Sequence, residues 1–192
     1  MINNVGTGIL GAAEESSVEQ VRQLFDVNFF GAVRMINAVL PMMRARRAGC
    51  ILLLSSAAGV MSVPFSAYYC ATKHALEAYG EALRLELEPF HIRVAIVAPG
   101  TVSTLAGDKA IQPDLPNADY EPVRQKTADK YVRAIHKGMP PERVAETILR
   151  IVRSRRPKPR YPVGAQSAAV SAMKSWLPAQ LFEVGVKQAV NY

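Results

Sequence analysis

The hydrophobic positions of this chain alternate between short runs and longer stretches with a 3.6-residue period. Apolar runs at 50–54 and 92–98 predict buried parallel strands, and residues 1–4 resemble the start of another strand. Apolar residues recur every three or four positions over 21–40 and 76–87, as they do on amphipathic helices. Strands that alternate with helices predict an α/β fold, built on a doubly wound parallel sheet with helices on both faces.

Local signals set the expected ends of the helices. Ser16-x-x-Glu19 has the spacing of a capping box and predicts the start of the first helix. The second long helix is expected over residues 67–87, where Pro89 stops it. Pro140-Pro141 suit the start of a further helix that runs through Val152.

The second half of the chain is less regular, although residues 1–192 are expected to form a single domain. Residues 105–140 carry scattered proline, aspartate and lysine with only a short helical pattern, and long segments of this kind are often functional. A short edge strand is predicted at 160–163, followed by a C-terminal tail over 165–192 whose helical pattern is broken at Pro178.

Composition narrows the possible function classes. The chain has 192 residues and is 49% hydrophobic, enough to build a core, and it contains neither an unbroken apolar run of about 18 residues nor a signal-peptide pattern. The net charge of +7 comes with basic residues that close helical patterns, where cations complement the helix dipole. An anionic partner is the alternative explanation, but no nucleic-acid motif accompanies the charge. Cys50 and Cys70 form neither a disulfide framework nor a metal-ligand spacing, which favours a reducing cytoplasm and no metal site.

The candidate chemistry lies in residues 55–73. Tyr69 and Lys73 are four positions apart, which places them on one face of a helix. An ammonium close to a phenol favours the phenolate, so we expect Lys73 to lower the pKa of Tyr69. Ser56 follows a buried strand, where its hydroxyl can hold the same oxygen atom that the phenol protonates. These groups together suit proton transfer to or from an alcohol or ketone oxygen.

Several motifs give this chain a likeness to a known family. They are Asn3-Asn4-Val5-Gly6, Asn28 within DVNFFG, Ser56, Tyr69-x-x-x-Lys73, and Pro99-Gly100 followed by Thr104. In this order and at these intervals, they resemble a classical short-chain dehydrogenase/reductase. The segments GILG, LPMMRARRAG and PFSAYYCATKHALEA are most similar to the branch of hydroxysteroid and retinol dehydrogenases.

The resemblance implies roles for individual residues. Tyr69 would be the general acid/base, Lys73 would lower its pKa and bind the nicotinamide ribose, Ser56 would orient the substrate oxygen, and Asn28 would loosen its helix and support a proton relay through water. Residues implied to bind NADP or NAD, with NADP favoured, are Asn4, Val5, Gly6, Tyr69, Lys73, Pro99, Gly100, Val102 and Thr104.

The resemblance also implies a hydrophobic alcohol or ketone as substrate. Residues expected to face it are Ser56, Met61, Phe65 and Tyr69, although the apolar loop residues among them equally suit ordinary loop packing. The family further implies a substrate lid over residues 105–140 and a homodimer or homotetramer. The C-terminal tail is expected to pack on its own domain, with contact to a partner subunit or a membrane surface as alternatives.

One departure from the family pattern is large. The Gly-rich dinucleotide loop of the family is absent, and Gly6-x-Gly8-x-x-Gly11 does not replace it, because Asp26, the acidic residue at about the right distance, lies in a helical pattern and not at a strand end. The chain therefore corresponds to the C-terminal portion of a Rossmann-type fold. The favoured explanation is a longer natural enzyme; the alternatives are an inactive fragment, completion by another polypeptide, or a non-catalytic subunit that uses its helices for dimerisation.

Overall fold

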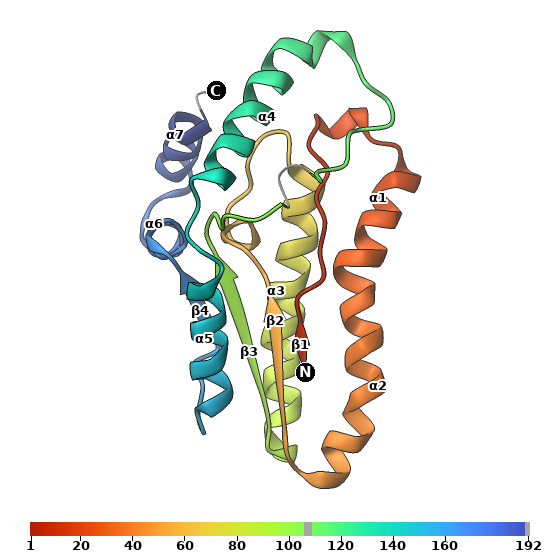
Figure 1. Ribbon diagram of the computed structural model, residues 1–192, viewed down its shortest axis with the longest axis vertical. Helices are drawn as coiled ribbons and strands as arrows, with labels where there is room; N and C mark the ends of the chain where they lie inside the picture. Colours follow the sequence, from red (N-terminus) through yellow and green to blue (C-terminus); the bar gives the residue numbers. More distant parts are fainter. Residues whose placement is uncertain (106–108, 191–192) are drawn as a thin grey trace.

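The computed structural model describes residues 1–105 and 109–190, and its centre is a parallel four-stranded sheet (Figure 1). The strand order is β1-β2-β3-β4, and Leu52 of β2 lies opposite both Ile2 and Ala95. This arrangement confirms the predicted α/β class and all four expected strands. The strands are β1 (Ile2–Asn3), β2 (Gly49–Leu54), β3 (Ile92–Pro99) and β4 (Arg160–Val163).

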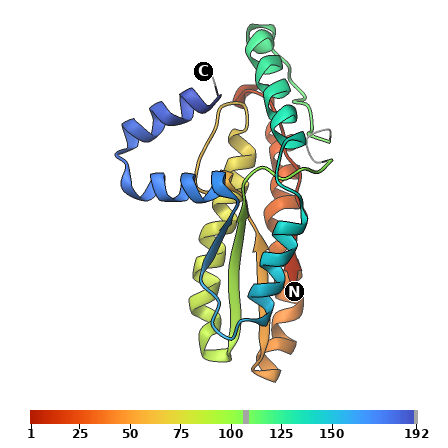
Figure 2. The same ribbon diagram turned by 60° about the vertical axis from the view of Figure 1, so that its left-hand side comes forward.

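Helices connect successive strands, as parallel pairing requires. The connecting helices are α1 (Val18–Phe25), α2 (Gly31–Arg46), α3 (Ala67–Leu87), α4 (Glu121–His136) and α5 (Glu142–Arg153). Two more helices, α6 (Ala165–Trp176) and α7 (Ala179–Val190), follow β4. A π-helical turn, Asp26–Phe30, joins α1 to α2. Figure 2 shows α6 and α7 extending away from the sheet, next to the carboxyl ends of the strands.

Both faces of the sheet are apolar because successive strand residues point to opposite sides. Ile51 and Leu53 pack with Ile36 and Leu83, which come from α2 and α3. On the other face, the alternate residues of β2 and β3 pack with α5; that cluster contains Leu52, Leu54, Ala95, Val97, Ile151 and Val163. This double burial explains why the central strands are continuous apolar runs.

The first helix does not begin with the expected capping box. Ser17, not Ser16, is the N-cap of α1, and its Oγ accepts a hydrogen bond from the backbone N–H of Gln20 at 3.1 Å. The carboxylate that reaches back to a backbone N–H is that of Glu15, which accepts from Ala12 at 2.8 Å. Glu15 is drawn there because its carboxylate also binds residues of the 111–124 segment, a contact that no local pattern encodes.

The continuous helical stretch Val18–Arg46 is, by length and composition alone, apolar enough to cross a membrane. A search for an unbroken apolar run misses it, since Asp26 and Arg34 interrupt the pattern. In the fold, Leu24 and Ile36 from this stretch are almost fully buried, and Ile36 belongs to the core on the α2–α3 face of the sheet. Of its apolar 18-residue window, 22% is buried, so the inner side of the stretch packs on the fold while most of the window stays exposed.

Two leucines of α3 give a direct test of this packing. Leu83 is buried in the core between α3 and the sheet, whereas Leu85 is 71% exposed on the opposite side of the same helix. We expect Leu83→Ala to lower the free energy of unfolding by about 3 kcal/mol, because it leaves a cavity in the core. Leu85→Ala should change it by less than about 0.5 kcal/mol. Urea unfolding of both variants measures the difference, and equal losses would contradict the assigned face.

Candidate active site

Ser56 lies just beyond the carboxyl end of β2, where the chain turns into the short helical segment Ala57–Gly59. Its Oγ caps that turn by accepting a hydrogen bond from the backbone N–H of Ala58 at 3.1 Å. The Tyr69 phenol lies close enough to the Ser56 side chain for that hydroxyl to oppose the effect of burial on the phenol's pKa. The two hydroxyls that the sequence places 13 positions apart are therefore brought together at the edge where parallel sheets hold their ligands.

Tyr69 and Lys73 project from the first turns of α3, as their spacing predicts. The Lys73 Nζ lies 5.7 Å from the centre of the Tyr69 ring, and it donates a hydrogen bond to the carbonyl of Leu54 at 3.0 Å. Leu54 is the last residue of β2, so this bond ties the helix that carries the phenol to the strand that leads to Ser56. Lys73 is 5% exposed, which makes it a buried cation.

The pKa of Tyr69 moves in the direction opposite to the sequence-based expectation. Burial raises the pKa of Tyr69 well above its ordinary value, the neighbouring Tyr131 adds to the rise, and the nearby Ser56 hydroxyl opposes it. Burial also lowers the pKa of Lys73 to about 8, against the opposing charge of Glu77. The expectation of an acidified phenol is therefore wrong for this structure, because loss of hydration outweighs the attraction of a cation that lies over the ring.

Asn28 occupies the π-helical turn between α1 and α2 and is fully buried. Its amide holds the backbone of Thr7 from both sides: Oδ1 accepts from the Thr7 N–H at 2.9 Å, and Nδ2 donates to the Thr7 carbonyl at 2.8 Å. Nδ2 also lies 3.1 Å from Thr72 Oγ1 on α3. The π-helical turn agrees with the expected loosening of the helix, and Asn28 fixes the segment that follows β1 against α3.

Gly6 lies between Asn28 and the lysine. A Cβ at position 6 would stand 3.4 Å from Lys73 Nζ and 3.5 Å from Asn28 Oδ1, so any larger side chain would crowd both groups. The preceding residues of this motif, Asn4 and Val5, are exposed at the carboxyl end of β1. The turn thus leaves an open backbone surface beside Lys73.

The second predicted cofactor segment, 99–104, leaves the carboxyl end of β3. Gly100 donates its N–H to Val163 at 2.9 Å, and the N–H and hydroxyl of Thr101 both bind Gln166 Oε1, at 2.9 and 2.7 Å. Val102 pairs with Met139 in an isolated bridge. Pro99 ends β3, and the residues that follow it lie at the same edge of the sheet as Ser56; they include Gly100, Val102 and Thr104. Gln166 of α6 holds this loop in place.

The predicted substrate residues are placed differently from one another. Phe65 is 7% exposed, and its ring meets the ring of Tyr120 edge-on, with 6.3 Å between the centroids. Tyr120 immediately precedes α4, so Phe65 faces the expected lid. Met61 is half-buried in the loop before α3. Phe65 thus joins the site to the lid, whereas the role of Met61 stays a prediction.

Sequence reasoning missed a polar cluster beneath the lysine. Glu77 is one turn further along α3 than Lys73, is 6% exposed, and forms an ion pair with Arg160 of β4 at 2.9 Å. Arg160 in turn donates to Ser171 of α6 at 2.6 Å. The four-residue spacing of Tyr69, Lys73 and Glu77 was a visible signal, but the partner on β4 depends on the tertiary fold.

The sequence of this chain is similar to those of known proteins. A sequence model described as short chain dehydrogenase matches residues 1–114. A 3-ketodihydrosphingosine reductase of Bacteroides thetaiotaomicron is 38% identical over 97% of this chain and 71% of its own length. The chain belongs to the short-chain dehydrogenase family.

Further relatives fit the same family. Retinol dehydrogenase 8 of Bos taurus is 34% identical to this short-chain dehydrogenase, over 93% of the chain and 60% of the relative. A short-chain dehydrogenase from Streptomyces avermitilis has a TM-score of 0.77 at 30% identity, covering 99% of this chain and 68% of that one. A serine dehydrogenase complexed with NADP⁺ has a TM-score of 0.66 at 26% identity, covering 84% and 62%. The expected family and fold are thereby confirmed.

The buried amide of this short-chain dehydrogenase gives a stability test. Asn28→Ala removes both bonds to the Thr7 backbone and the contact with Thr72, so buried polar groups lose their partners. We expect a loss of about 2 kcal/mol or more in the free energy of unfolding. Asn37→Ala is the matched control, since Asn37 is exposed on α2 and should cost less than about 0.5 kcal/mol. A parent-like unfolding midpoint for Asn28→Ala would contradict the role of Asn28.

Proposed function

We propose that this chain carries the reactive half of an oxidoreductase that moves a hydride reversibly between a nicotinamide cofactor and a hydrophobic alcohol or ketone. The observation that carries the proposal is the closeness of the Ser56 hydroxyl and the Tyr69 phenol at the carboxyl edge of the sheet, with Lys73 held next to them by the Leu54 carbonyl. Membership of the short-chain dehydrogenase family supports the same chemistry.

The residues present fit a nicotinamide cofactor. The residues after β1 are exposed, and Gly6 among them lies next to Lys73, which suits the approach of a ligand to that turn. Lys73 donates one bond to Leu54, and an ammonium has three donors, so it can also bind a ribose hydroxyl. A bound nicotinamide supplies or accepts the hydride. NADP is slightly favoured over NAD on the net charge of +7, and related dehydrogenases of known structure hold either NAD or NADP⁺.

The side chains of this chain handle the proton and the oxygen. In the direction of reduction, Tyr69 donates its phenolic proton to the carbonyl oxygen while Ser56 holds that oxygen by a hydrogen bond. Lys73 lies below the ring and stabilises the phenolate that results. Burial keeps the pKa of Tyr69 high, so the phenol is protonated at neutral pH and ready to act as the acid.

A hydrophobic substrate agrees with the surroundings of the phenol. Phe65 and Met61 lie in the loop between Ser56 and Tyr69, and Tyr120 packs against Phe65 from the lid. The two relatives are named for 3-ketodihydrosphingosine and for retinol, and both molecules are largely apolar. We infer a lipid-like ketone or alcohol as the substrate class.

We also propose a homo-oligomer in the cytoplasm. Several apolar side chains of the helical stretch Val18–Arg46 are exposed, as expected of a surface that a second copy covers; they include Val27, Phe30, Met35 and Met42. Both cysteines are free thiols, which agrees with a reducing compartment.

The proposed chemistry is tested on the 192-residue chain itself. NADPH and NADH are titrated while nicotinamide fluorescence is followed, and turnover is then measured with a long-chain ketone. Tyr69→Phe should lower kcat by about a thousandfold without weakening cofactor binding, because only the transferred proton is lost. The matched control is Tyr79→Phe on the same helix, which keeps its ring contact with Phe29 and should leave kcat unchanged. Turnover that survives in Tyr69→Phe, or cofactor binding by the parent chain without any turnover of the ketone, would contradict the proposal.

A further inference from the structure

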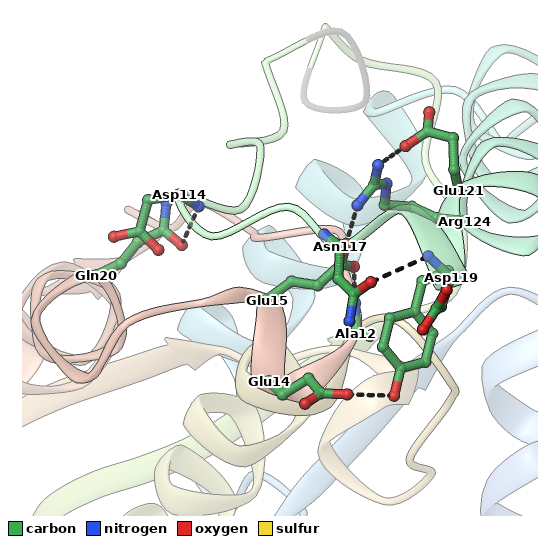
Figure 3. Close-up of polar contacts among 10 residues, drawn as sticks. Ala12, Glu14, Glu15, Gln20, Asp114, Asn117, Asp119, Glu121 and Arg124 are labelled. Carbon is green, nitrogen blue, oxygen red and sulfur yellow. Dashed lines mark hydrogen bonds and ion pairs between the residues drawn. The ribbon is translucent and has the colours of Figure 1, made fainter.

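Two segments far apart in the sequence lie side by side above the site. Figure 3 shows polar contacts between residues 12–20 and residues 114–124, which lead into the lid helix α4. The backbone begins the association: Ile111 donates to Gly8 at 2.8 Å, Leu10 donates to Ile111 at 3.2 Å, and Leu115 donates to the carbonyl of Glu15 at 2.8 Å. The strand-like pairing of these segments fixes the point at which the lid enters.

Glu15 is the centre of this contact. Its side chain is fully buried, and Oε2 accepts from the Ala12 N–H at 2.8 Å while Oε1 accepts from the Asn117 N–H at 2.9 Å. Oε1 also forms an ion pair with Arg124, which is itself largely buried and pairs in addition with Glu121. A buried carboxylate is costly unless its charge is paired and its oxygens are hydrogen-bonded. Glu15 therefore constrains the position of Arg124, which lies in the first turn of α4.

Exposed contacts surround this centre. Tyr120 donates to Glu14 at 2.5 Å, and the Ser17 hydroxyl donates to Asp114 at 2.5 Å. Water and salt screen such contacts, so each contributes little on its own. The ion pair of Glu15 and Arg124 is buried, so water does not compete with this contact between the two segments.

The lid that this pair anchors reaches the reactive phenol. Tyr120, just before α4, packs edge-on against Phe65, and Tyr131 on α4 is close enough to interact electrostatically with Tyr69. From below, the same N-terminal segment passes the phenol, because a Cβ at Gly8 would lie 3.6 Å from the Tyr69 ring. Movement of α4 would therefore change both the apolar wall at Phe65 and the exposure of Tyr69.

We propose that Glu15 and Arg124 are positioning residues: their buried ion pair holds the lid helix α4 over Phe65 and Tyr69 and so completes the wall of the substrate site. Neither residue touches the reacting atoms. The role in substrate binding rests on the proposed oxidoreductase function, whereas the anchoring of α4 over Tyr69 does not.

The anchoring is tested without cofactor or substrate. Glu15→Gln and Arg124→Gln remove the charge pair, and Arg34→Gln is the control, since it breaks the exposed Asp26–Arg34 pair far from the lid. Hydrogen exchange of residues 121–136 and nitration of Tyr69 by tetranitromethane, mapped by mass spectrometry, report lid opening. We expect both rates to rise about tenfold or more in the two variants and to stay parent-like in the control. Parent-like rates in folded variants would overturn the proposal. So would loss of folding in both variants, because a lid anchor leaves the sheet core intact.

Turnover then separates this proposal from the proposed function. If both hold, the two variants raise KM for the long-chain ketone about tenfold while kcat stays within about threefold, since they remove binding shared by ground and transition states. A parent chain without turnover, but with the expected exchange and nitration, would refute the oxidoreductase function and leave the anchor standing. A fall in kcat with unchanged KM would refute the positioning role alone.

Discussion

The bond from Lys73 to the Leu54 carbonyl is the constraint on which the site depends. It joins α3 to the last residue of β2 and, at 3.0 Å, fixes the depth at which the helix lies against the sheet. Such close packing requires glycine at position 80, where a Cβ would approach the side chains of Leu53 and Ile96 to within 2.9 Å. With α3 in this place, Tyr69 meets Ser56 without any further adjustment of the backbone.

Burial gives the site its electrostatic character. A lysine and a phenol that lose their water both favour their neutral forms, so burial lowers the pKa of Lys73, raises the pKa of Tyr69 and moves the two values apart. Glu77 opposes the shift at Lys73, and its own charge is paired with Arg160. The edge strand β4 and helix α6, which are remote in sequence from the reactive residues, are thereby coupled to the protonation of the lysine. The protonation of Lys73 therefore depends on a polar network of Glu77, Arg160 and Ser171 that extends from α3 to β4 and α6.

The strands and the helix face that carries Tyr69 and Lys73 were predicted from the sequence, each for a physical reason. The strands at 50–54, 92–98 and 160–163 were predicted because burial on both faces leaves continuous apolar runs and an edge position tolerates Pro162. The Tyr69–Lys73 face followed from helical geometry alone. The direction of the Tyr69 pKa was not predictable, because it depends on how much water the fold removes.

The polar contacts between residues far apart in the sequence were also not predicted. The partners of Glu15 lie about a hundred positions away, and the nearby Ser16-x-x-Glu19 pattern predicted a cap one residue from the true one. Glu77 and Arg160 are likewise separated by 83 positions. Local patterns specify helices and strands, whereas a buried charge finds its partner only when the layers are assembled.

The most direct test of this account is the pKa of the Lys73 amine, measured by NMR from the ¹³Cε shift as pH is varied and assigned with Lys73→Arg. The account predicts a value of about 8, so that the amine is protonated below that pH and neutral above it. A value of about 10.4, the ordinary range for a solvated lysine, would contradict the buried lysine on which the arrangement of Ser56 and Tyr69 depends.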